Sequence, residues 1–355
     1  MTPLRFIHMA DLHLDNKLSY STYDKDGMSS TLAMMKENLH SVRRVAIEKE
    51  CKFIIVAGDI FNRYRPDEKA RVVWADFIKQ CIENGIKIIG ITGQHDIGVE
   101  NPHMAFNTLT GSDVRILDEA TTIWSSDERI VFTCVPYRAF MGRIIPPIGK
   151  DNAKYHIFIG HFPVSGSKLD GKNPFFSDDW MPLSAYNKLL EEYDYVALGD
   201  IHHRQLSYPG SLINMDFGDP DSEKGFYYVE ETDKGLEKAF IPHINQRKFL
   251  IFNESVFAVR NETLTISLKD MIVRVESTDP TLLNEMEKYC QDEGASFVVS
   301  KLLPKFEIRK ERIKGLDGKK LDIKIAITDY VERNVSSNDQ KERLIEVGLS
   351  YVGEK

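Results

Sequence analysis

Apolar and polar positions follow two different patterns along the first two-thirds of the chain. Short apolar runs rich in β-branched residues, such as LRFIHMA at 4–10 and KFIIVAG at 52–58, predict buried strands. Segments with a helical period follow them at 29–50 and 67–85. The first helix opens with a serine cap, and the second has an acid-rich start and a glycine stop. This alternation predicts an α/β fold.

Five further runs in the same region also predict strands. They are IKIIGIT at 86–92, VRILDEA at 114–120, IVFTCVPY at 130–137, YHIFIG at 155–160 and YVALG at 195–199. The segment 163–180 has no period and predicts a long loop. Loops of that length inside a compact domain are often functional.

The pattern changes after about residue 240. The runs DMIVRVES, DPTLLNEMEKYCQDEG and SFVVSKLL predict a small strand–helix–strand unit over 270–303. A stretch rich in lysine and arginine follows at 301–320, and residues 321–355 predict two amphipathic helices interrupted at 334–339. We therefore divide the chain into 1–240, 241–310 and 311–355.

Composition limits the protein class only moderately. A chain of 355 residues with 42% apolar and 28% charged residues is typical of globular proteins. The net charge of −8 argues against a broadly basic nucleic-acid-coating protein, although it allows a local basic groove. It also fits carboxylates gathered around divalent metals.

Cysteine usage and apolar runs indicate the compartment. The four cysteines are scattered without CxxC spacing, which indicates reduced thiols and not a zinc site or disulfide frame. The N-terminal sequence lacks the regions of a signal peptide, and no apolar run approaches the length of about 18 residues that a bilayer requires. We expect a cytoplasmic protein without a membrane segment.

Acids, amides and histidines gather where five predicted strands end. The stretches are HMADLHLD at 8–15, AGDIFN at 57–62, TGQHD at 92–96, GHF at 160–162 and LGDIHHRQ at 198–205. A single aspartate at such a position is more often a turn former, and a single buried histidine is more often a hydrogen-bonded core residue. Five in order, at the strand ends where α/β sheets place their sites, predict a functional site.

The side chains in these stretches suit two hard divalent cations. Carboxylates and imidazoles suit Mn²⁺, with Zn²⁺ or Fe²⁺ also compatible, and the lack of thiolates disfavours structural zinc. If 11–13 is extended, Asp11 and His13 point the same way and can bind one ion. Asp59 follows a glycine and could bridge both ions. Two ions about 3.5–4 Å apart can clamp the attacking and leaving oxygens of a phosphoester.

In this order, DLH, GDIFN, GQHD, GHF and GDIH resemble the calcineurin-like metallophosphoesterase superfamily, whose usual pattern is DxH, GDxxD, GNHD, GH and GHxH. HMADLHLD, ALGDIHHRQ followed by YPGSL, and the strand–helix–strand unit look like the SbcD-type DNA-repair exonuclease subunit, including phage-encoded relatives. The resemblance implies a two-sheet β-sandwich flanked by helices, with a small α+β capping domain and C-terminal helices. The three segments would then be a nuclease domain, a DNA-positioning cap, and a linker with a helical partner-binding segment.

The resemblance also assigns roles to individual residues. The first metal would be held by Asp11, His13, Asp59 and His202, and the second by Asp59, Gln94, His161 and Asp200. His95 would stabilise the transition state or protonate the leaving oxygen, oriented by Asp96, while His203 should point away. Partner binding would fall to apolar positions of the terminal helices, among them Ile327, Tyr330, Leu344, Val347 and Tyr351.

Three positions depart from the family pattern. Gln94 stands where the family has Asn, Asp200 where it has His, and Asn62 where it has Asp. Asn62 should affect only the hydrogen bonds behind the ligands. The other two both fall on the second metal. They could compensate each other, a longer arm offsetting a shorter one. Alternatively, the second site is weak and fills only with substrate, or the enzyme is inactive.

The resemblance implies a DNA nuclease with two Mn²⁺ ions, or Mg²⁺ in their place. It would hydrolyse phosphodiesters at DNA ends, as a double-strand exonuclease and single-strand endonuclease, in repair and recombination. Its partners would be an SbcC-type, SMC-like ATPase and a second copy in a homodimer, in a bacterial or phage-infected cytosol. Two alternatives stay open, a small-substrate phosphodiesterase or phosphatase of the same superfamily and a DNA-end-binding scaffold. The basic stretch could be a solvated linker or a DNA-facing surface, and the terminal helices a folded-back tail or a docking element.

Overall fold

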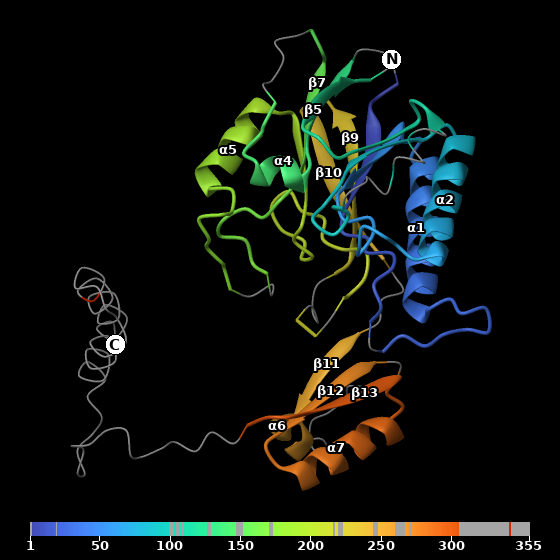
Figure 1. The fold of residues 1–355 in the computed structure, drawn as a ribbon, viewed down its shortest axis with the longest axis vertical. Coiled ribbons are helices and arrows are strands. Elements are labelled where there is room, and N and C mark those ends of the chain that lie inside the picture. The colour runs from blue at the N-terminus through green and yellow to red at the C-terminus, as the bar shows by residue number, and fades with distance from the viewer. Residues whose placement is uncertain are drawn as a thin grey trace. The chain divides into compact units, whose positions relative to one another are not determined.

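Two β-sheets face each other through a shared apolar layer in the computed structural model (Figure 1). The six-stranded sheet has the order β10-β9-β1-β2-β3-β4, and the four-stranded sheet the order β5-β6-β7-β8. The strands of the first are β1 Arg5–Met9, β2 Phe53–Ala57, β3 Lys87–Ile91, β4 Val114–Leu117, β9 Gly225–Thr232 and β10 Gly235–Pro242. Those of the second are β5 Thr121–Trp124, β6 Ile130–Val135, β7 Tyr155–His161 and β8 Tyr195–Gly199.

The structure describes residues 2–304, apart from 19, 99–102, 104–106, 108–109, 126–128, 147–151, 170–172, 216, 219–222, 244–247, 260–266 and 270, together with residue 341. The chain divides into two units, 1–303 and 304–355. The terminal helices with Ile327, Tyr330, Leu344, Val347 and Tyr351, and the basic stretch beyond 304, therefore lie outside the described residues and stay predictions.

Parallel pairing explains why β2, in the middle of its sheet, is apolar at every position. β1 to β4 pair in parallel, and all five residues of β2 are buried. Phe53, Ile55 and Ala57 belong to the layer between the two sheets, whereas Ile54 and Val56 belong to the layer beneath the helices. β2 therefore contributes side chains to both apolar layers, one on each face of the sheet.

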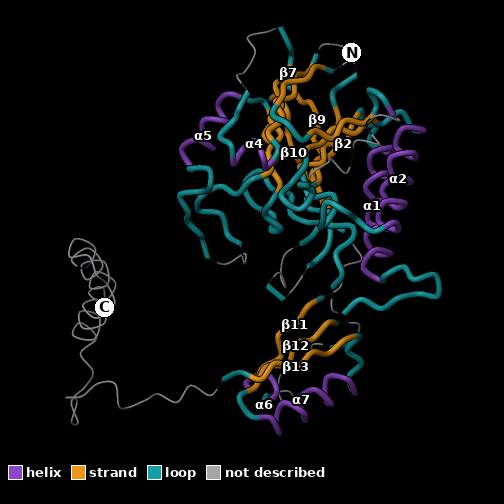
Figure 2. The backbone as a smooth tube through the Cα atoms, in the orientation of Figure 1, coloured by secondary structure: helices purple, strands orange, loops and turns teal. Residues whose placement is uncertain are grey.

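Helices cover the outer face of each sheet (Figure 2). α1 Ser30–Glu48 and α2 Glu68–Glu83 pack on the six-stranded sheet, and α4 Tyr137–Met141 and α5 Leu183–Glu192 on the four-stranded sheet. Ser29 accepts a hydrogen bond from the Leu32 amide, which confirms the predicted serine cap. Asp67 caps α2 in the same way through Ala70.

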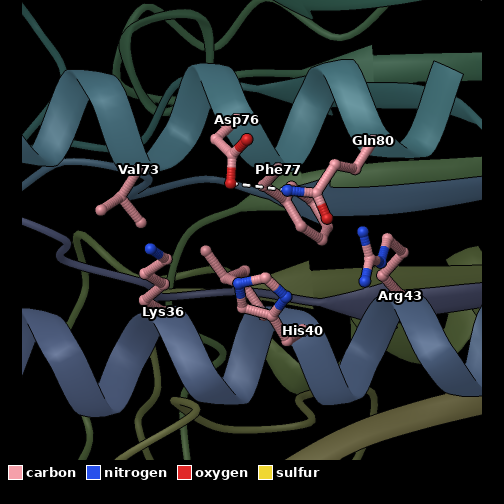
Figure 3. A pocket seen from close by; sticks show the side chains of 8 residues that line it. Lys36, His40, Arg43, Val73, Asp76, Phe77 and Gln80 are labelled. Atoms are coloured by element: carbon pink, nitrogen blue, oxygen red, sulfur yellow. Dashed lines mark hydrogen bonds between the residues drawn. The ribbon is translucent and has the colours of Figure 1, made fainter. Parts of the chain in front are cut away.

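The two long helices meet along a narrow groove with polar edges. Figure 3 shows the side chains of Lys36, His40 and Arg43 on α1 and of Val73, Asp76, Phe77 and Gln80 on α2. Gln80 donates to Asp76 along α2. The groove holds about 10 Å³, room for a single water molecule, so it is a packing seam and not a ligand site.

A smaller α+β unit follows the sandwich. Three parallel strands in the order β11-β12-β13 pack against two helices, with the bounds β11 Phe249–Asn253, α6 Glu254–Ala258, β12 Ile272–Ser277, α7 Pro280–Asp292 and β13 Phe297–Leu302. Its own core includes Phe252, Val275 and Met286. The predicted strand–helix–strand unit is confirmed as β12, α7 and β13.

The predicted fold class, a two-sheet sandwich flanked by helices, is confirmed. The sequence patterns missed β5, β9, β10, β11 and the helices α4, α5 and α6. α4 and α6 have only five residues each, too few to establish a helical period. The four cysteines are buried and free, as predicted. Among the helices of the described residues, none has the length and apolar character needed to cross a bilayer.

The layer between the sheets should control stability. Ile55 is fully buried there, whereas Ile47 on α1 is 42% exposed. We expect Ile55→Ala to lower the free energy of unfolding by about 2–5 kcal/mol, because it removes buried apolar contacts and leaves a cavity. Urea unfolding followed by circular dichroism measures this. The matched variant Ile47→Ala should change the value by less than about 0.5 kcal/mol; equal losses in both would contradict the assignment of this layer as the core.

Candidate metal centre

The segments after β1 and β2 run side by side at the edge where the strands end. The amide of Asp11 donates to the carbonyl of Gly58 (3.2 Å), and the amide of His13 donates to the carbonyl of Asp59 (3.0 Å). The amide of Asp200, after β8, donates to the Asp11 carboxylate at 3.0 Å. Backbone bonds therefore bring together side chains that are up to 189 residues apart in sequence.

Two glycines allow the side chains to approach closely. A Cβ atom on Gly58, which has a φ of +90°, would lie 2.0 Å from Nδ1 of His161. A Cβ on Gly93 would lie 2.1 Å from Oδ1 of Asp59. Any larger residue at either position would displace a candidate ligand.

Four candidate ligands have a left-handed backbone. The φ values are 53° for Asp11, 44° for His13, 50° for Asp59 and 102° for Asp200. Such conformations cost on the order of 1–3 kcal/mol each and gather at functional sites. The expectation that residues 11–13 are extended is therefore wrong. Residues 11–13 run alongside the turn after β2 and are hydrogen-bonded to it. This contact brings Asp11 and His13 into one cluster.

Three imidazoles surround one oxygen of Asp59. Its Oδ2 atom lies 3.4 Å from Nε2 of His161, 3.6 Å from Nε2 of His13 and 4.0 Å from Nε2 of His95. Oδ1 accepts the amide of His95 at 2.9 Å. Asp59 is fully buried, and Oδ2 has no hydrogen-bond partner. This geometry suits a carboxylate that bridges two cations.

His13 also forms a pair with His202, and this pair lies beside Asp11. The Nε2 atoms of His13 and His202 face each other at 3.2 Å, and Asp11 joins them in one group of potential ligands. Nδ1 of His13 contacts Oδ1 of Asn62 at 3.1 Å, which leaves Nε2 directed into the cluster. Asn62 thus orients a candidate ligand from behind.

The donor atoms fit divalent cations. Two ligand atoms that each lie about 2.1 Å from one cation are at most about 4.2 Å apart, and the separations from 3.2 to 4.0 Å in this cluster satisfy that limit. Nε2 of His161 and Oε1 of Gln94 are, like Oδ2 of Asp59, buried without a hydrogen-bond partner. Nδ1 of His161 contacts the carbonyl of Ala57 at 2.6 Å, so Nε2 faces the cluster. Three orphaned polar atoms at one place indicate a site built for a ligand that binds them.

Protonation in the cluster follows from burial and from charges nearby. Burial raises the pKa of Asp11 to about 8. Burial opposes ionisation of Asp59 as well, but His161 outweighs it and keeps the pKa of Asp59 below its usual value. Burial lowers the pKa of His161, yet the charge of Asp59 reverses this and raises it to about 10. Burial lowers the pKa of His13 and of His202, so both rings are neutral, the form that binds a cation.

The two unusual residues of the sequence touch each other. Nε2 of Gln94 donates to Oδ1 of Asp200 at 2.6 Å, although the residues are 106 positions apart. The same Oδ1 lies 3.8 Å from Nε2 of His161. The side-chain amide of Gln94 therefore holds the carboxylate of Asp200 beside His161. Oε1 of Gln94 has no hydrogen-bond partner and stays available to bind a cation. This contact favours the hypothesis that a longer arm at 94 compensates for a shorter one at 200.

His95 and Asp96 have separate surroundings. The side chain of His95 is 43% exposed, and its Nδ1 faces the carbonyl of Asn62 at 3.3 Å. Asp96 is buried and accepts the backbone amides of Ile60, Phe61 and Gly93 at 3.0–3.2 Å. The expectation that Asp96 orients the ring of His95 does not match these contacts. Asp96 instead ties the turn after β3 to the turn after β2.

Sequence patterns missed two residues that support the cluster. Lys224 is fully buried, and its ammonium donates to the carbonyl of His202 at 2.7 Å. Asp15 is buried, accepts the amide of Asn62 at 2.6 Å and pairs with Arg63 at 2.7 Å. Asp15 belongs to the first motif and could have been considered, whereas no local signal marks Lys224. His203 is buried but belongs to none of the potential ligand groups among the described residues.

Comparison with known proteins gives a family and several distant relatives. Residues 4–204 match the family described as calcineurin-like phosphoesterase. The chain is 28% identical to the uncharacterized metallophosphoesterase YhaO of Bacillus subtilis over 68% of its own length, and it spans 60% of that relative. It is 24% identical to the DNA double-strand break repair protein Mre11 of Methanocaldococcus jannaschii, over 95% of this chain and 92% of that protein. The crystal structure of TT1561 of Thermus thermophilus aligns with 67% of this chain and 99% of that one, at 11% identity and a TM-score of 0.40.

Removing the carboxylate of Asp200 should affect one ion only. We expect the parent chain to bind two Mn²⁺ ions and Asp200→Ala to bind one tightly, because the group of Asp11, His13 and His202 does not include residue 200. Isothermal titration with Mn²⁺ gives the stoichiometry. The control Asp233→Ala changes an exposed turn aspartate and should leave it unchanged. Two tight ions in Asp200→Ala would rule out Asp200 as a ligand.

The contact between Gln94 and Asp200 predicts that substitutions at the two positions are not additive. We expect Gln94→Asn and Asp200→His each to weaken the second Mn²⁺ site, because each alone breaks the 2.6 Å bond. The double variant has the family's residues at both positions and should recover part of the loss. A coupling energy of about 0.5–3 kcal/mol is expected from the titrations. Strict additivity would show that the two departures are independent.

Proposed function

Because the chain belongs to the calcineurin-like phosphoesterase family, we propose that it is the nuclease subunit of a DNA-end-processing complex that hydrolyses phosphodiester bonds. The family is one of metal-dependent hydrolases, and the site described above provides candidate ligands for divalent cations. The nuclease assignment, with Mn²⁺ as the metal and the cytoplasm as the compartment, is the proposal.

One observation carries the choice of DNA as substrate. The alignment with the Mre11 protein of Methanocaldococcus jannaschii covers 95% of this chain, whereas the family match ends at residue 204. The similarity therefore extends through the α+β unit of β11 to β13 and into the region beyond 304. A second Mre11 protein, from Methanopyrus kandleri, is 23% identical over 93% of this chain. Segments that a small-substrate phosphatase does not need support a large substrate and a partner protein.

The cluster assigns each residue a task in phosphodiester hydrolysis. Asp11, His13, Asp59 and His202 would hold one cation, and Asp59, Gln94, His161 and Asp200 the other. Two bound cations would supply Lewis-acid stabilisation of the charge that develops on the phosphoryl oxygens.

His95 suits proton transfer to the leaving oxygen. It is the most exposed imidazole among those around Asp59, so it lies where a substrate can reach it. The carbonyl of Asn62 accepts Nδ1–H of the ring, and Nε2 is left facing the site, so the doubly protonated ring would donate the Nε2 proton to the leaving oxygen. The backbone amide of His95 donates to Oδ1 of Asp59, which ties the backbone at His95 to the carboxylate of the cluster.

Two other functions are compatible with the same cluster. A small-substrate phosphodiesterase would use the same residues, and the relative YhaO, whose name gives a metallophosphoesterase without a substrate, leaves that alternative open. A DNA-end-binding scaffold would follow if the second cation were not held. We propose that the partners are an SbcC-type ATPase docked on the terminal helices and a second copy of the chain.

The nuclease proposal predicts which substrate is cut. With Mn²⁺, the purified chain should degrade linear duplex DNA from its ends and cleave single-stranded circles. We expect His95→Ala to lower kcat by about 10²–10⁴-fold, because the proton donor is lost while the ligands remain. Gel analysis of end-labelled DNA measures the rate.

The controls separate the alternatives. His40→Ala, a histidine on α1 outside the cluster, should cut at the parent rate. Cleavage of a chromogenic phosphodiester or phosphomonoester without cleavage of DNA would support the small-substrate enzyme and overturn the nuclease. Equal residual activity in the parent and in His95→Ala would overturn catalysis altogether.

A further inference from the structure

The layer between the two sheets ends in a cavity at the edge opposite the metal centre. This is the end of the sandwich at which the N-terminus lies (Figure 1). The cavity has a volume of about 320 Å³ and is lined by residues at the starts of β1, β2, β3, β6 and β7. Small-molecule sites begin at about 300 Å³, so the space is sufficient for one small ligand.

The inner wall of this cavity is apolar and aromatic. Phe53 and Phe132 come from opposite sheets and meet edge to face, with ring centroids 5.3 Å apart. Tyr155 and Trp124 complete the aromatic lining, and the indole of Trp124 is 46% exposed. A flat apolar ring system could stack there.

The outer wall is basic, and the strand register explains why. Lys87 and Ile89 share a face of β3, and Arg115 pairs with Ile89 in the sheet. Ile89 packs against the layer between the sheets, so Lys87 and Arg115 lie on the inward face. The alternation that supplies apolar residues further along these strands supplies cations at the cavity.

Carboxylates neutralise only part of this charge. Lys52 and Arg129 also line the cavity, which makes four cations. Lys87 pairs with Asp113 at 3.9 Å, and Arg129 pairs with Glu231 at 3.6 Å. Within the described part of the chain, Lys52 and Arg115 have no acidic partner, and no acid lines the cavity. This is a local basic site in a protein with a net charge of −8.

Protection of a sheet edge explains one of the four cations, Arg115. Inward-pointing charges on edge strands prevent pairing with other chains, and Arg115 lies on the edge strand β4. Lys52, Lys87 and Arg129 lie at the starts of β2, β3 and β6, which are interior strands. Edge protection does not explain cations there, whereas an anion-binding site does.

We propose that this cavity binds a nucleoside 5′-monophosphate. The base would stack against Trp124 and the Phe53–Phe132 wall, and the phosphate would lie between Lys52 and Arg115, the two cations without carboxylate partners. A doubly charged phosphate suits two such cations, and the volume accommodates a single nucleotide unit. This site is separate from the metal centre and goes beyond the proposed nuclease function.

The test uses the full chain in EDTA, so that no divalent cation can hold the phosphate at the metal centre. Calorimetric titration with deoxyadenosine 5′-monophosphate should give saturable binding, and the fluorescence of the three tryptophans should be partly quenched, with the quenching lost in Trp124→Phe. Deoxyadenosine and inorganic phosphate should each bind at least about tenfold more weakly than the nucleotide, because each lacks half of the contacts. Arg115→Ala should weaken binding about tenfold, since it removes a charged hydrogen bond. Trp124→Ala should weaken binding as well, and Arg115→Lys and Trp124→Phe should each bind more tightly than the alanine variant at the same position.

Two controls locate the binding. Arg44→Ala removes an exposed cation of α1, and His95→Ala changes the metal centre; both should bind the nucleotide like the parent. Arg115 and Trp124 are exposed enough that thermal unfolding should be unchanged in their variants. Absence of binding at millimolar nucleotide, parent-like affinity in Arg115→Ala, or loss of binding in His95→Ala would overturn the proposal. Inorganic phosphate binding as tightly as the nucleotide would overturn the nucleotide assignment.

Discussion

The carboxylate of Asp59 is the group on which the metal centre depends. It is fully buried and ionised, with one oxygen fixed by a backbone amide and the other left among three imidazoles without a hydrogen bond. A buried charge without compensation costs several kcal/mol. In the protein alone, His161 supplies that compensation, which is why the pKa of His161 is raised to about 10. Bound cations would replace this proton, so cation binding and proton release are linked at one residue pair.

The sandwich stabilises this arrangement. Left-handed backbone at Asp11, His13, Asp59 and Asp200 would not persist in an isolated loop, because each costs on the order of 1–3 kcal/mol. Here each segment emerges from a strand that is buried on both faces, and backbone bonds join neighbouring segments. Asp96 joins the turn after β3 to the turn after β2 through the amides of Ile60 and Phe61, and it accepts the amide of Gly93 within its own turn. The strain is therefore carried by segments that are tied to buried strands and to one another by hydrogen bonds.

The departures from the family pattern gain a physical meaning from the contact between Gln94 and Asp200. Considered alone, a longer amide and a shorter carboxylate each weaken a cation site. Joined at 2.6 Å, they form one unit in which the amide places the carboxylate. At the opposite end of the sandwich, Lys87 and Arg115 occupy positions on the inward face of the sheet. Further along the same strands, that face carries apolar residues. Both ends of the same layer thus carry polar chemistry, and the apolar residues between them supply the stability.

The sequence by itself determined the parts that depend on near neighbours. Strand and helix periods predicted most of the central strands, the serine cap of α1 and the strand–helix–strand unit, because burial on one or two faces repeats within a few residues. Because chemistry in such folds gathers at strand ends, the five motifs also predicted that Asp11, Asp59, His161 and His202 belong to one site. Only the tertiary structure decided which atoms meet. The Gln94–Asp200 bond, the support of His202 by Lys224 and the backbone role of Asp96 depend on strand order and register. These are set by the packing of whole sheets, and no short stretch of sequence contains them.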